Sequence, residues 1–247
     1  MLVLPLGGGS FCTGGSPLGM IGCNMTSPTS EQDTNIQRAS KLDTTAISDA
    51  LDRLGIAGQC LNIKPLDHRF RLTGRAFTIL YGPAGVPPGT VGDYIDDVPP
   101  GSVVVLDNGG RENATVWGDI LTWVANRRGV AGTVIDGACR DTHLSRELGY
   151  PIFSRSYSMR TGKDRVQVEA MNGPVNIGDA RVYPGDILRG DADGVLAIPR
   201  AHEDAVLAAA EEIDAVEQKI RAAVNEGQTL SAARKSLGYH QLQARRK

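Results

Sequence analysis

The residues best suited to chemistry are an arginine and an aspartate that stand side by side, Arg140 and Asp141. They follow an apolar run with strand character at residues 131–135, a predicted break at residues 136–137, and they precede a predicted helix at residues 142–148. An arginine at the end of a buried strand can bind a carboxylate through two parallel hydrogen bonds. An aspartate beside it offers oxygen ligands to a hard divalent cation. The pair therefore predicts a site that binds a metal ion and an anionic substrate together.

The same pair also has a purely structural interpretation. Asp141 can cap the following helix with its side chain and can pair with Arg140 on the surface. Cys139 precedes Arg140, and a neighbouring cation can acidify a thiol, although such a cysteine is more often a small buried side chain. These residues alone leave both interpretations of the pair open.

The composition limits the classes of protein to which the chain can belong. Its 247 residues, 41% of them hydrophobic, suffice for one large domain or two small ones. The formal net charge of -2 gives no electrostatic reason to expect binding to nucleic acid or to an anionic membrane. The four cysteines form no CxxC pair, and the four histidines lack metal-ligand spacing. No apolar run reaches the ~20 residues of a membrane span. The first residues lack the basic region of a signal peptide, so we expect a cytoplasmic protein.

The chain is predicted to have three parts. Residues 1–37 are rich in glycine, serine and other polar residues and are predicted to form a disordered leader. Residues 38–200 are predicted to form the main domain. Residues 201–247 are predicted to form a helical tail with an apolar stripe from Val206 to Val224. Such a stripe packs on the body of the chain or on a neighbouring subunit.

Within the main domain, hydrophobic spacing predicts the order of the elements. One helix is expected to start at Asp43 or Thr44 and to run to Leu54, and another to run from about Ala114 to Arg127. Strand-like runs are expected at residues 61–63, 74–80, 103–106, 131–135, 151–153, 166–168, 175–177, 180–183, 187–188 and 195–198. The middle third alternates strands with helices, which is typical of an α/β fold.

Several segments together resemble one known family. They are ISDALDRLG, IKPLDHRFRLTGRAFT, PPGSVVVLDNGG, ATVWGDILTWVA, RRGVAGTVIDGACRD, ELGYPIFSR and VYPGDILRGDADGVLAIPR. They occur in the family's order between about Leu42 and Arg200, and the run VIDGACRD with the PGD…DGVLAIP ending is distinctive. On these motifs the chain resembles the regulator-of-ribonuclease-activity A-like proteins. That family includes 4-hydroxy-4-methyl-2-oxoglutarate aldolases, which also decarboxylate oxaloacetate.

The resemblance implies a fold, an assembly and roles for particular residues. The fold would be a layered β/β/α fold of the swivelling-domain type with an added C-terminal helix, assembled as trimers or hexamers with the active site between subunits. Asp141 would bind the divalent metal, Mg²⁺ or Mn²⁺, and Arg140 would bind the oxo-acid substrate. The backbone N–H groups at the start of a helix would hold the substrate carboxylate. These groups belong to Gly118, Asp119, Ile120 and Leu121.

The reaction implied is the metal-dependent retro-aldol cleavage of 4-hydroxy-2-oxo diacids to pyruvate, together with decarboxylation of oxaloacetate. The cation would act as a Lewis acid that stabilises the pyruvate enolate. Arg140 would add a second positive charge, and a water held by Asp119 would take the proton of the C4 hydroxyl. No Schiff-base lysine is required, which agrees with site segments that contain no lysine.

One departure from the family pattern leaves a second function open. In the aldolases an acidic residue commonly stands two residues beyond the Arg–Asp pair, whereas here Thr142 and His143 are followed by Leu144. A chain without that acid could be a non-catalytic regulator that binds a ribonuclease or another protein through the same oligomer. A methyltransferase is not supported, because no glycine-rich cofactor loop follows a strand. The aldolases also use a glutamate from a neighbouring tail helix. The candidates here are Glu211, Glu212 and Glu217.

Overall fold

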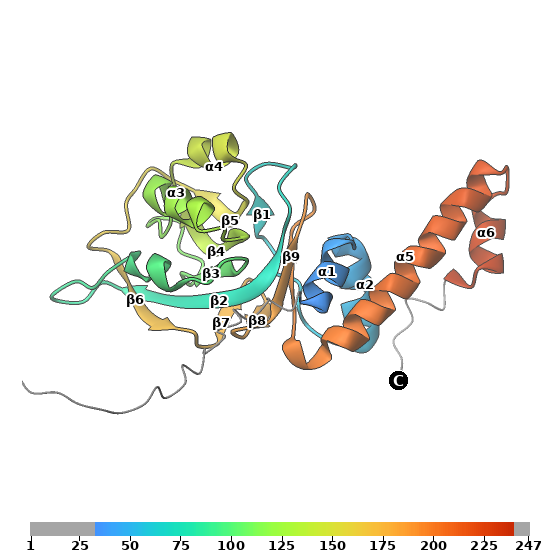
Figure 1. Ribbon diagram of the computed structural model, residues 1–247, viewed down its shortest axis with the longest axis horizontal. Coiled ribbons are helices and arrows are strands. Elements are labelled where there is room, and N and C mark those ends of the chain that lie inside the picture. The colour runs from blue at the N-terminus through green and yellow to red at the C-terminus, as the bar shows by residue number, and fades with distance from the viewer. Residues whose placement is uncertain (1–32, 240–247) are drawn as a thin grey trace, which may run out of the picture. The chain divides into compact units, whose positions relative to one another are not determined.

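A mixed sheet of eight strands organises residues 33–239, the part of the chain that this computed structural model describes (Figure 1). Hydrogen-bonded neighbours follow the order β1-β5-β4-β3-β2-β9-β10, and β6 also pairs with β2. The strands are β1 (Lys64–Pro65), β2 (Leu72–Pro83), β3 (Val103–Asp107), β4 (Gly132–Cys139), β5 (Ile152–Tyr157), β6 (Val166–Met171), β9 (Ile187–Gly190) and β10 (Val195–Ile198).

Four neighbouring strands, β2 to β5, run parallel and are covered on both faces. Every residue of β3 and β4 is buried, as expected for continuous apolar strands. One face packs against the helix α3 (Asp119–Arg127) and the 3-10 helix η1 (Asp93–Asp97), and α4 (Thr142–Leu148) contacts α3. The hairpin of β7 (Val175–Ile177) and β8 (Ala180–Val182) covers the other face (Figure 1). This layering confirms the predicted mixed α/β fold.

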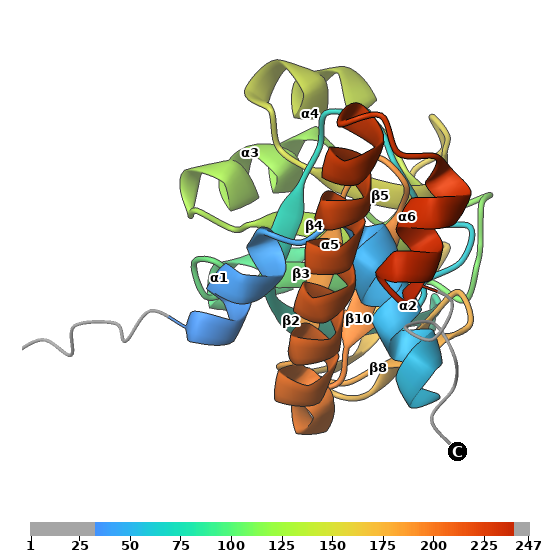
Figure 2. The same ribbon diagram turned by 90° about the vertical axis from the view of Figure 1, so that its right-hand side faces the viewer.

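Three further helices lie beside β9 and β10, namely α1 (Thr34–Ser40), α2 (Thr44–Leu54) and α5 (Glu203–Asn225), and a fourth, α6 (Leu230–Ser236), packs on α5. In Figure 2, α5 passes between α1 and α2, and these three helices share an apolar cluster with β9 and β10. The first half of the predicted tail stripe, through Ile213, therefore packs on the chain's own body. None of the helices within residues 33–239 combines the length and the apolar content needed to cross a bilayer.

Helix α2 forms where its sequence predicts it. Ala46, Ile47, Ala50 and Leu51 make its buried face, and Gly55 ends it in the left-handed conformation that glycine adopts readily. The expected strand at residues 61–63 is wrong: residues 61 and 62 form a turn, and β1 starts at Lys64. The apolar residues of that run are too few to distinguish a strand from a buried turn.

Helix α1 corrects the predicted boundary of the leader, which was placed at residue 37. The helix begins at Thr34, and the Asp33 carboxylate accepts hydrogen bonds from the amides of Asn35 and Ile36, which caps it. The same carboxylate pairs with Arg75 of β2 at 2.7 Å. Residues 34–37 are therefore part of the folded body, whereas residues 1–32 and 240–247 of the predicted leader and tail lie outside the described residues.

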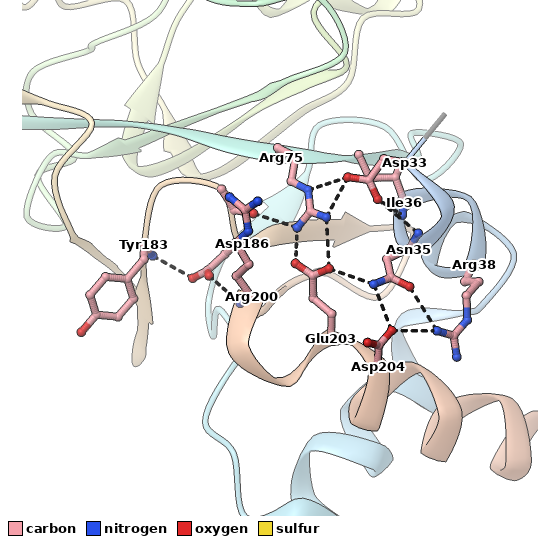
Figure 3. A network of polar contacts seen from close by, with 11 residues as sticks. Asp33, Asn35, Ile36, Arg38, Arg75, Tyr183, Asp186, Arg200, Glu203 and Asp204 are labelled. Atoms are coloured by element: carbon pink, nitrogen blue, oxygen red, sulfur yellow. Dashed lines mark hydrogen bonds and ion pairs between the residues drawn. The ribbon is translucent and has the colours of Figure 1, made fainter. Parts of the chain in front are cut away.

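A network of charged side chains joins α1 to the start of α5 (Figure 3). Arg75 binds the buried Glu203 carboxylate through both terminal nitrogens, and Asn35 donates a hydrogen bond to the same carboxylate at 3.0 Å. Arg38 makes two hydrogen bonds, of 2.8 and 2.9 Å, to Glu211 on the next turns of α5. These bonds fix α1 on the body together with the apolar contacts of Ala39 and Ile36.

The α1–α5 contact predicts an acid-sensitive part of the protein's stability. The hydrogen bond from Arg38 lowers the pKa of Glu211 below 4.5. Burial alone would raise the pKa of Asp33, but the hydrogen bond and charge of Arg75, together with the hydrogen bonds from the Ile36 and Asn35 amides, lower that pKa below 3.8. A carboxylate with a lowered folded-state pKa stabilises the fold above its ordinary pKa, and this contribution disappears as the pH falls through the folded-state value.

We therefore expect Arg38→Gln to lower the thermal midpoint at neutral pH, because Glu211 loses its partner. The difference from wild type should shrink as the pH falls below 4.5, where Glu211 of the variant begins to protonate. Thermal unfolding followed by circular dichroism over a pH series measures this. A difference that stays constant down to the acid limit would show that the pair does not contribute through the charge of Glu211.

Candidate active site

The strand that leads to Arg140 is longer than its apolar run. β4 does not break at residues 136–137; it continues to Cys139 through an irregularity between Ile135 and Ala138 in its pairing with β5. At the end of the strand the Arg140 amide donates a hydrogen bond of 2.9 Å to the Trp117 carbonyl. This bond ties the Arg–Asp pair to a segment that lies more than twenty residues earlier in the chain.

That earlier segment corrects the predicted helix at residues 114–127. Residues 115 and 116 instead lie beside β4, because Thr115 forms a β-bridge with Ala138 and the Val116 amide donates to the Ala138 carbonyl at 3.1 Å. The helix α3 begins only at Asp119, with Gly118 as its first flanking residue. Hydrogen bonds to a distant strand edge have replaced the local helical ones, and no local sequence pattern reports them.

Asp141 has the backbone conformation that most clearly suggests a functional role. Its φ of 55° and ψ of 39° are left-handed, a conformation that residues other than glycine rarely adopt. It precedes α4, but its side chain makes no capping bond to that helix, so the capping interpretation is wrong. Instead, its Oδ2 accepts a bond of 3.3 Å from the Asp119 amide and lies 3.4 Å from Arg140 Nε. Such backbone conformations cluster at active sites.

Glycine at position 118 allows the two segments to meet. A Cβ atom on Gly118 would lie 3.0 Å from Asp141 Oδ2 and 3.2 Å from Arg140 Nε. Any side chain there would crowd the charged groups. The structure thus brings Gly118, Asp119, Arg140 and Asp141 into contact, and Ile120 and Leu121 follow in the first turn of α3.

The amides at the start of α3 already attract carboxylates. The Asp119 amide binds Asp141, and the Ile120 amide donates a bond of 2.8 Å to the Asp119 side chain. The N-terminus of a helix favours anions because its first N–H groups lack intrahelical partners. Two protein carboxylates therefore occupy backbone amides to which the family resemblance assigns a substrate carboxylate. A substrate that binds there would have to displace the Asp119 side chain from the Ile120 amide.

Two buried side chains behind the site hold this turn. Trp117 Nε1 donates to Thr122 Oγ1 at 2.8 Å, and Thr122 Oγ1 donates to the Gly118 carbonyl at 2.8 Å. Thr122 is 1% exposed, and Trp117 also stacks on Tyr150 with ring centroids 6.2 Å apart. The Trp117 carbonyl holds Arg140, so this pair of side chains fixes both segments of the site.

Thr122→Val is expected to lower the free energy of unfolding, because it breaks the hydrogen bond between Trp117 and Thr122. Valine keeps the shape but removes the acceptor, so the buried Trp117 indole N–H loses its partner at a cost of about 1–3 kcal/mol in the free energy of unfolding. Thr122→Ser retains the hydroxyl and should recover most of this loss. Urea unfolding of the three proteins measures the difference. Equal stability of the valine and serine variants would show that the hydroxyl is dispensable.

An open pocket of about 460 Å³ lies in front of these residues. It is lined by the start of α3 and by Arg140, and also by three charged residues that the sequence analysis did not include, namely Asp93, Asp96 and Lys163. The predicted site segments contain no lysine, but the pocket acquires one, Lys163, from another segment. Asp141 opens instead onto an adjacent hollow that it shares with Arg140, His143 and Tyr157. Arg140 thus borders both spaces.

The site offers one carboxylate in a position to bind a metal ion. No cluster of three or more histidine, cysteine, aspartate or glutamate side chains suited to a metal occurs within residues 33–239. The Asp141 side chain is 32% exposed and faces open space. Mg²⁺ commonly keeps several waters and binds through one or two carboxylates and substrate oxygens, so this donor set fits Mg²⁺ or the similarly oxygen-seeking Mn²⁺. Burial raises the pKa of the neighbouring Cys139 thiol, which agrees with a structural cysteine.

Two of the three candidate tail glutamates are bound within their own chain. Glu211 pairs with Arg38 at 2.8 Å, and Glu212 pairs with the buried Arg53 at 2.8 Å. Glu217 lies further along α5, where Arg221 is 3.5 Å away. Of the three, Glu217 is the candidate that is not used to hold α5 on the body.

Comparison with known proteins shows the family. A family model described as RraA-like, Aldolase/RraA, matches residues 44–197, which include the whole candidate site. The chain belongs to the Aldolase/RraA family. Its site residues lie within the matched region, whereas α1, α5 and α6 lie outside it.

Individual relatives of this Aldolase/RraA chain carry different names. The chain is 39% identical over 209 residues to Protein DlpA of Legionella pneumophila, a match that covers 83% of the chain but 34% of DlpA, so the chain spans about a third of that relative. It is 34% identical over 185 residues to a Halalkalibacterium halodurans protein named "Putative 4-hydroxy-4-methyl-2-oxoglutarate aldolase", covering 75% of the chain and 86% of that protein.

A solved structure supports the same fold. Streptomyces coelicolor RraAS2, described as an unusual member of the RNase ES inhibitor RraA protein family, matches with a TM-score of 0.72 at 25% identity. The match covers 76% of this chain and 97% of RraAS2. Members of the Aldolase/RraA family thus carry both enzyme names and inhibitor names. The choice between these functions for this chain therefore depends on the chemistry of its own site.

Proposed function

We propose that the protein is a divalent-metal-dependent lyase that cleaves 4-hydroxy-2-oxo diacids to pyruvate and also decarboxylates oxaloacetate. The observation that carries the proposal is the left-handed Asp141, whose carboxylate accepts the Asp119 amide at the start of α3 and lies beside Arg140, the residue that borders both the α3 pocket and the hollow of Asp141. Relatives named as aldolases of this type support a lyase. A surface ion pair would not require the strained conformation of Asp141.

Asp141 would hold Mg²⁺ or Mn²⁺ through its carboxylate. When bound, such a cation supplies a Lewis acid that stabilises negative charge on the oxygen of a 2-oxo group. The remaining work falls to the protein's own groups. Arg140 binds the oxo-acid and places its positive charge close to the C2 oxygen as that oxygen becomes an enolate oxygen. The amides of Ile120 and Leu121 lie at the start of α3, where the helix favours the substrate carboxylate.

The proton transfer is assigned to Asp119. A substrate carboxylate that takes over the Ile120 amide releases the Asp119 side chain, which then accepts the C4-hydroxyl proton through an ordered water. The C4–O bond becomes a carbonyl, the C3–C4 bond breaks, and its electron pair forms the C2–C3 double bond of the pyruvate enolate. In oxaloacetate the C3–C4 bond breaks to release carbon dioxide and the same enolate, and no base is needed.

The proposal includes a homo-oligomer, a trimer or hexamer. Four large apolar side chains near the site are half or more exposed on the single chain: Ile120, Trp123, Tyr157 and Met159. A second subunit would cover them and would narrow the pocket opening. Light scattering at micromolar concentration tests this, because a clean monomer would remove the oligomer from the proposal.

A non-catalytic regulator is the second candidate function. It is favoured by Leu144, which stands where the aldolases carry an acid, and by the match to RraAS2, a member of an RNase inhibitor family. The two functions differ in turnover. A regulator would bind a ribonuclease and would leave oxo-acids unchanged.

The deciding assay follows pyruvate release from oxaloacetate and from 4-hydroxy-2-oxoglutarate, with Mg²⁺ and with a chelator. The lyase proposal expects Mg²⁺-dependent release that the chelator abolishes. Oxaloacetate should release pyruvate even if cleavage of 4-hydroxy-2-oxoglutarate needs the acidic side chain that Leu144 replaces. Absence of release from both substrates at saturating Mg²⁺ and Mn²⁺ would reject the lyase in favour of the regulator.

A further inference from the structure

The pocket in front of α3 has a second positively charged residue, Lys163, on the side away from Arg140. Isolated β-bridges join three segments beneath the pocket, with Thr115 in the middle one. The Thr115 amide and hydroxyl both donate to the Arg160 carbonyl, at 3.2 and 2.9 Å, whereas the next amide donates to Ala138. Successive amides of an extended segment point to opposite edges. The segment with Lys163 and the segment with Arg140 therefore flank residues 115–117 from opposite sides.

This arrangement sets the spacing between the two cations. Thr115 pairs with Ala138 on one edge and with Thr161 on the other, so Arg140 and Lys163 each stand two residues beyond a residue paired with Thr115. Adjacent strands are about 4.8 Å apart, so the two outer backbones are separated by ~10 Å at Ala138 and Thr161. Both side chains are long and line the same pocket. A four- or five-carbon diacid can thus extend from one cation to the other.

The position of Lys163 is fixed by the glycine before it. A Cβ atom on Gly162 would lie 2.2 Å from the Thr115 carbonyl oxygen and 2.9 Å from Val166 Cγ2. Only glycine allows the segment to approach Thr115 this closely. Lys163 therefore projects from a fixed backbone, which lowers the entropy lost when it binds a ligand.

The other charges around the pocket leave Lys163 available. Asp96 lies 3.7 Å from Arg128, and the Asp119 carboxylate accepts the Ile120 amide. Asp93 is exposed in η1 and also lines the pocket. Among residues 33–239 no carboxylate lies within ion-pair distance of the Lys163 ammonium group. A lysine without an acidic partner on a pocket wall is suited to an anionic ligand.

We propose that Lys163 binds the carboxylate at the end of the substrate remote from Arg140 and so selects diacids over monoacids. The inference rests on the proposed function, because it takes the ligand to be a 2-oxo acid. Arg140 serves the oxo-acid end, which diacids and monoacids share. Lys163 contributes only when the second carboxylate is present.

Calorimetric binding of two unreactive 2-oxo acids tests this in the presence of Mg²⁺. 2-Oxoglutarate has the second carboxylate and 2-oxobutanoate lacks it, and neither carries the C4 hydroxyl needed for cleavage. A hydrogen bond to a charged group contributes about 1.5–3 kcal/mol, which corresponds to a tenfold to hundredfold change in affinity. Lys163→Met should weaken 2-oxoglutarate binding by that factor and leave 2-oxobutanoate binding unchanged.

Lys163→Arg should keep most of the preference for the diacid, and Lys219→Met, which removes an exposed lysine of α5, should keep all of it. An unchanged affinity of Lys163→Met for 2-oxoglutarate, or an equal loss for both ligands, would overturn the assignment.

The failure of this assignment and the failure of the lyase proposal are distinguishable. If the wild type prefers the diacid through Lys163 but cleaves no substrate, the lyase proposal is rejected and the assignment of Lys163 as a carboxylate-binding residue is kept. If the wild type cleaves hydroxy-oxo diacids but Lys163→Met keeps the preference, only the Lys163 assignment fails. A wild type that binds neither acid refutes both.

Discussion

Asp141→Asn is expected to abolish Mg²⁺-dependent release of pyruvate while leaving a cooperatively folded protein. Asparagine tolerates the left-handed conformation of residue 141 and can still accept the Asp119 amide through its carbonyl oxygen. It lacks the negative charge through which a carboxylate attracts a hard divalent cation most strongly. Loss of a Lewis acid that supplies several kcal/mol of transition-state stabilisation should lower kcat/KM by a factor of about a hundred or more.

The control for Asp141→Asn is the same substitution at Asp164, an exposed aspartate with a similar φ of 61°. Asp164→Asn should leave activity intact. Oxaloacetate is the substrate of choice, because its decarboxylation does not depend on the acid that Leu144 replaces. Full turnover of Asp141→Asn at saturating Mg²⁺ would remove Asp141 from the metal site.

Arg75→Met is expected to produce the largest loss of stability in the described structure. Glu203 is 7% exposed, and Arg75 is the cation that binds both of its oxygens. Removing one partner of a buried ion pair leaves an uncompensated charge, which typically costs about 3–5 kcal/mol. Asp33 loses the same partner, so α1 should detach more readily. Chemical denaturation followed by far-ultraviolet circular dichroism measures the loss.

Two comparisons make the Arg75 result specific. The double variant Arg75→Met with Glu203→Leu removes both buried charges and should regain much of the stability, because apolar replacement of a complete buried pair is often neutral. Arg69→Met breaks only the exposed pair with Asp67 and should barely change the midpoint. If Arg75→Met behaved like Arg69→Met, the network in Figure 3 would be irrelevant to stability.

The sequence predicts most of the helices and strands because their signals are local. The buried face of α2 with Gly55, the apolar run of β3 and the stripe of α5 each specify their own element. The order of the family motifs also identifies the family, and the mixed α/β fold follows from it.

The errors arise where distant residues determine the structure. Residues 114–117 are not helical because β4 and the segment at Thr161 offer hydrogen bonds on both edges of Thr115 and Val116. Helix α1 has an unremarkable polar sequence, and its stabilising partners are Arg75, Glu203 and Glu211, all far away in the chain. A local pattern cannot report partners that only folding brings near.

In the candidate site, too, the features set by neighbouring residues are predictable from the sequence and those set by distant residues are not. Arg140 and Asp141 are adjacent in the chain, so their contact can be predicted from spacing. The left-handed conformation of Asp141 and the presence of Lys163 in one pocket with Arg140 cannot be predicted in this way, because both follow from packing around Thr115 and Gly118. No spacing rule connects Lys163 to the Arg–Asp pair.

The long strand β2 has a consequence for how the chain acquires this structure during synthesis. One edge of β2 pairs with β3, which follows closely, but its other edge pairs with β6 and β9, at residues 166–171 and 187–190. Most of the chain must therefore leave the ribosome before β6 and β9 can pair with the second edge of β2. An uncovered edge is a template for pairing with other chains. The yield of correctly folded protein should thus depend on translation speed and on chaperones that shield the nascent β2.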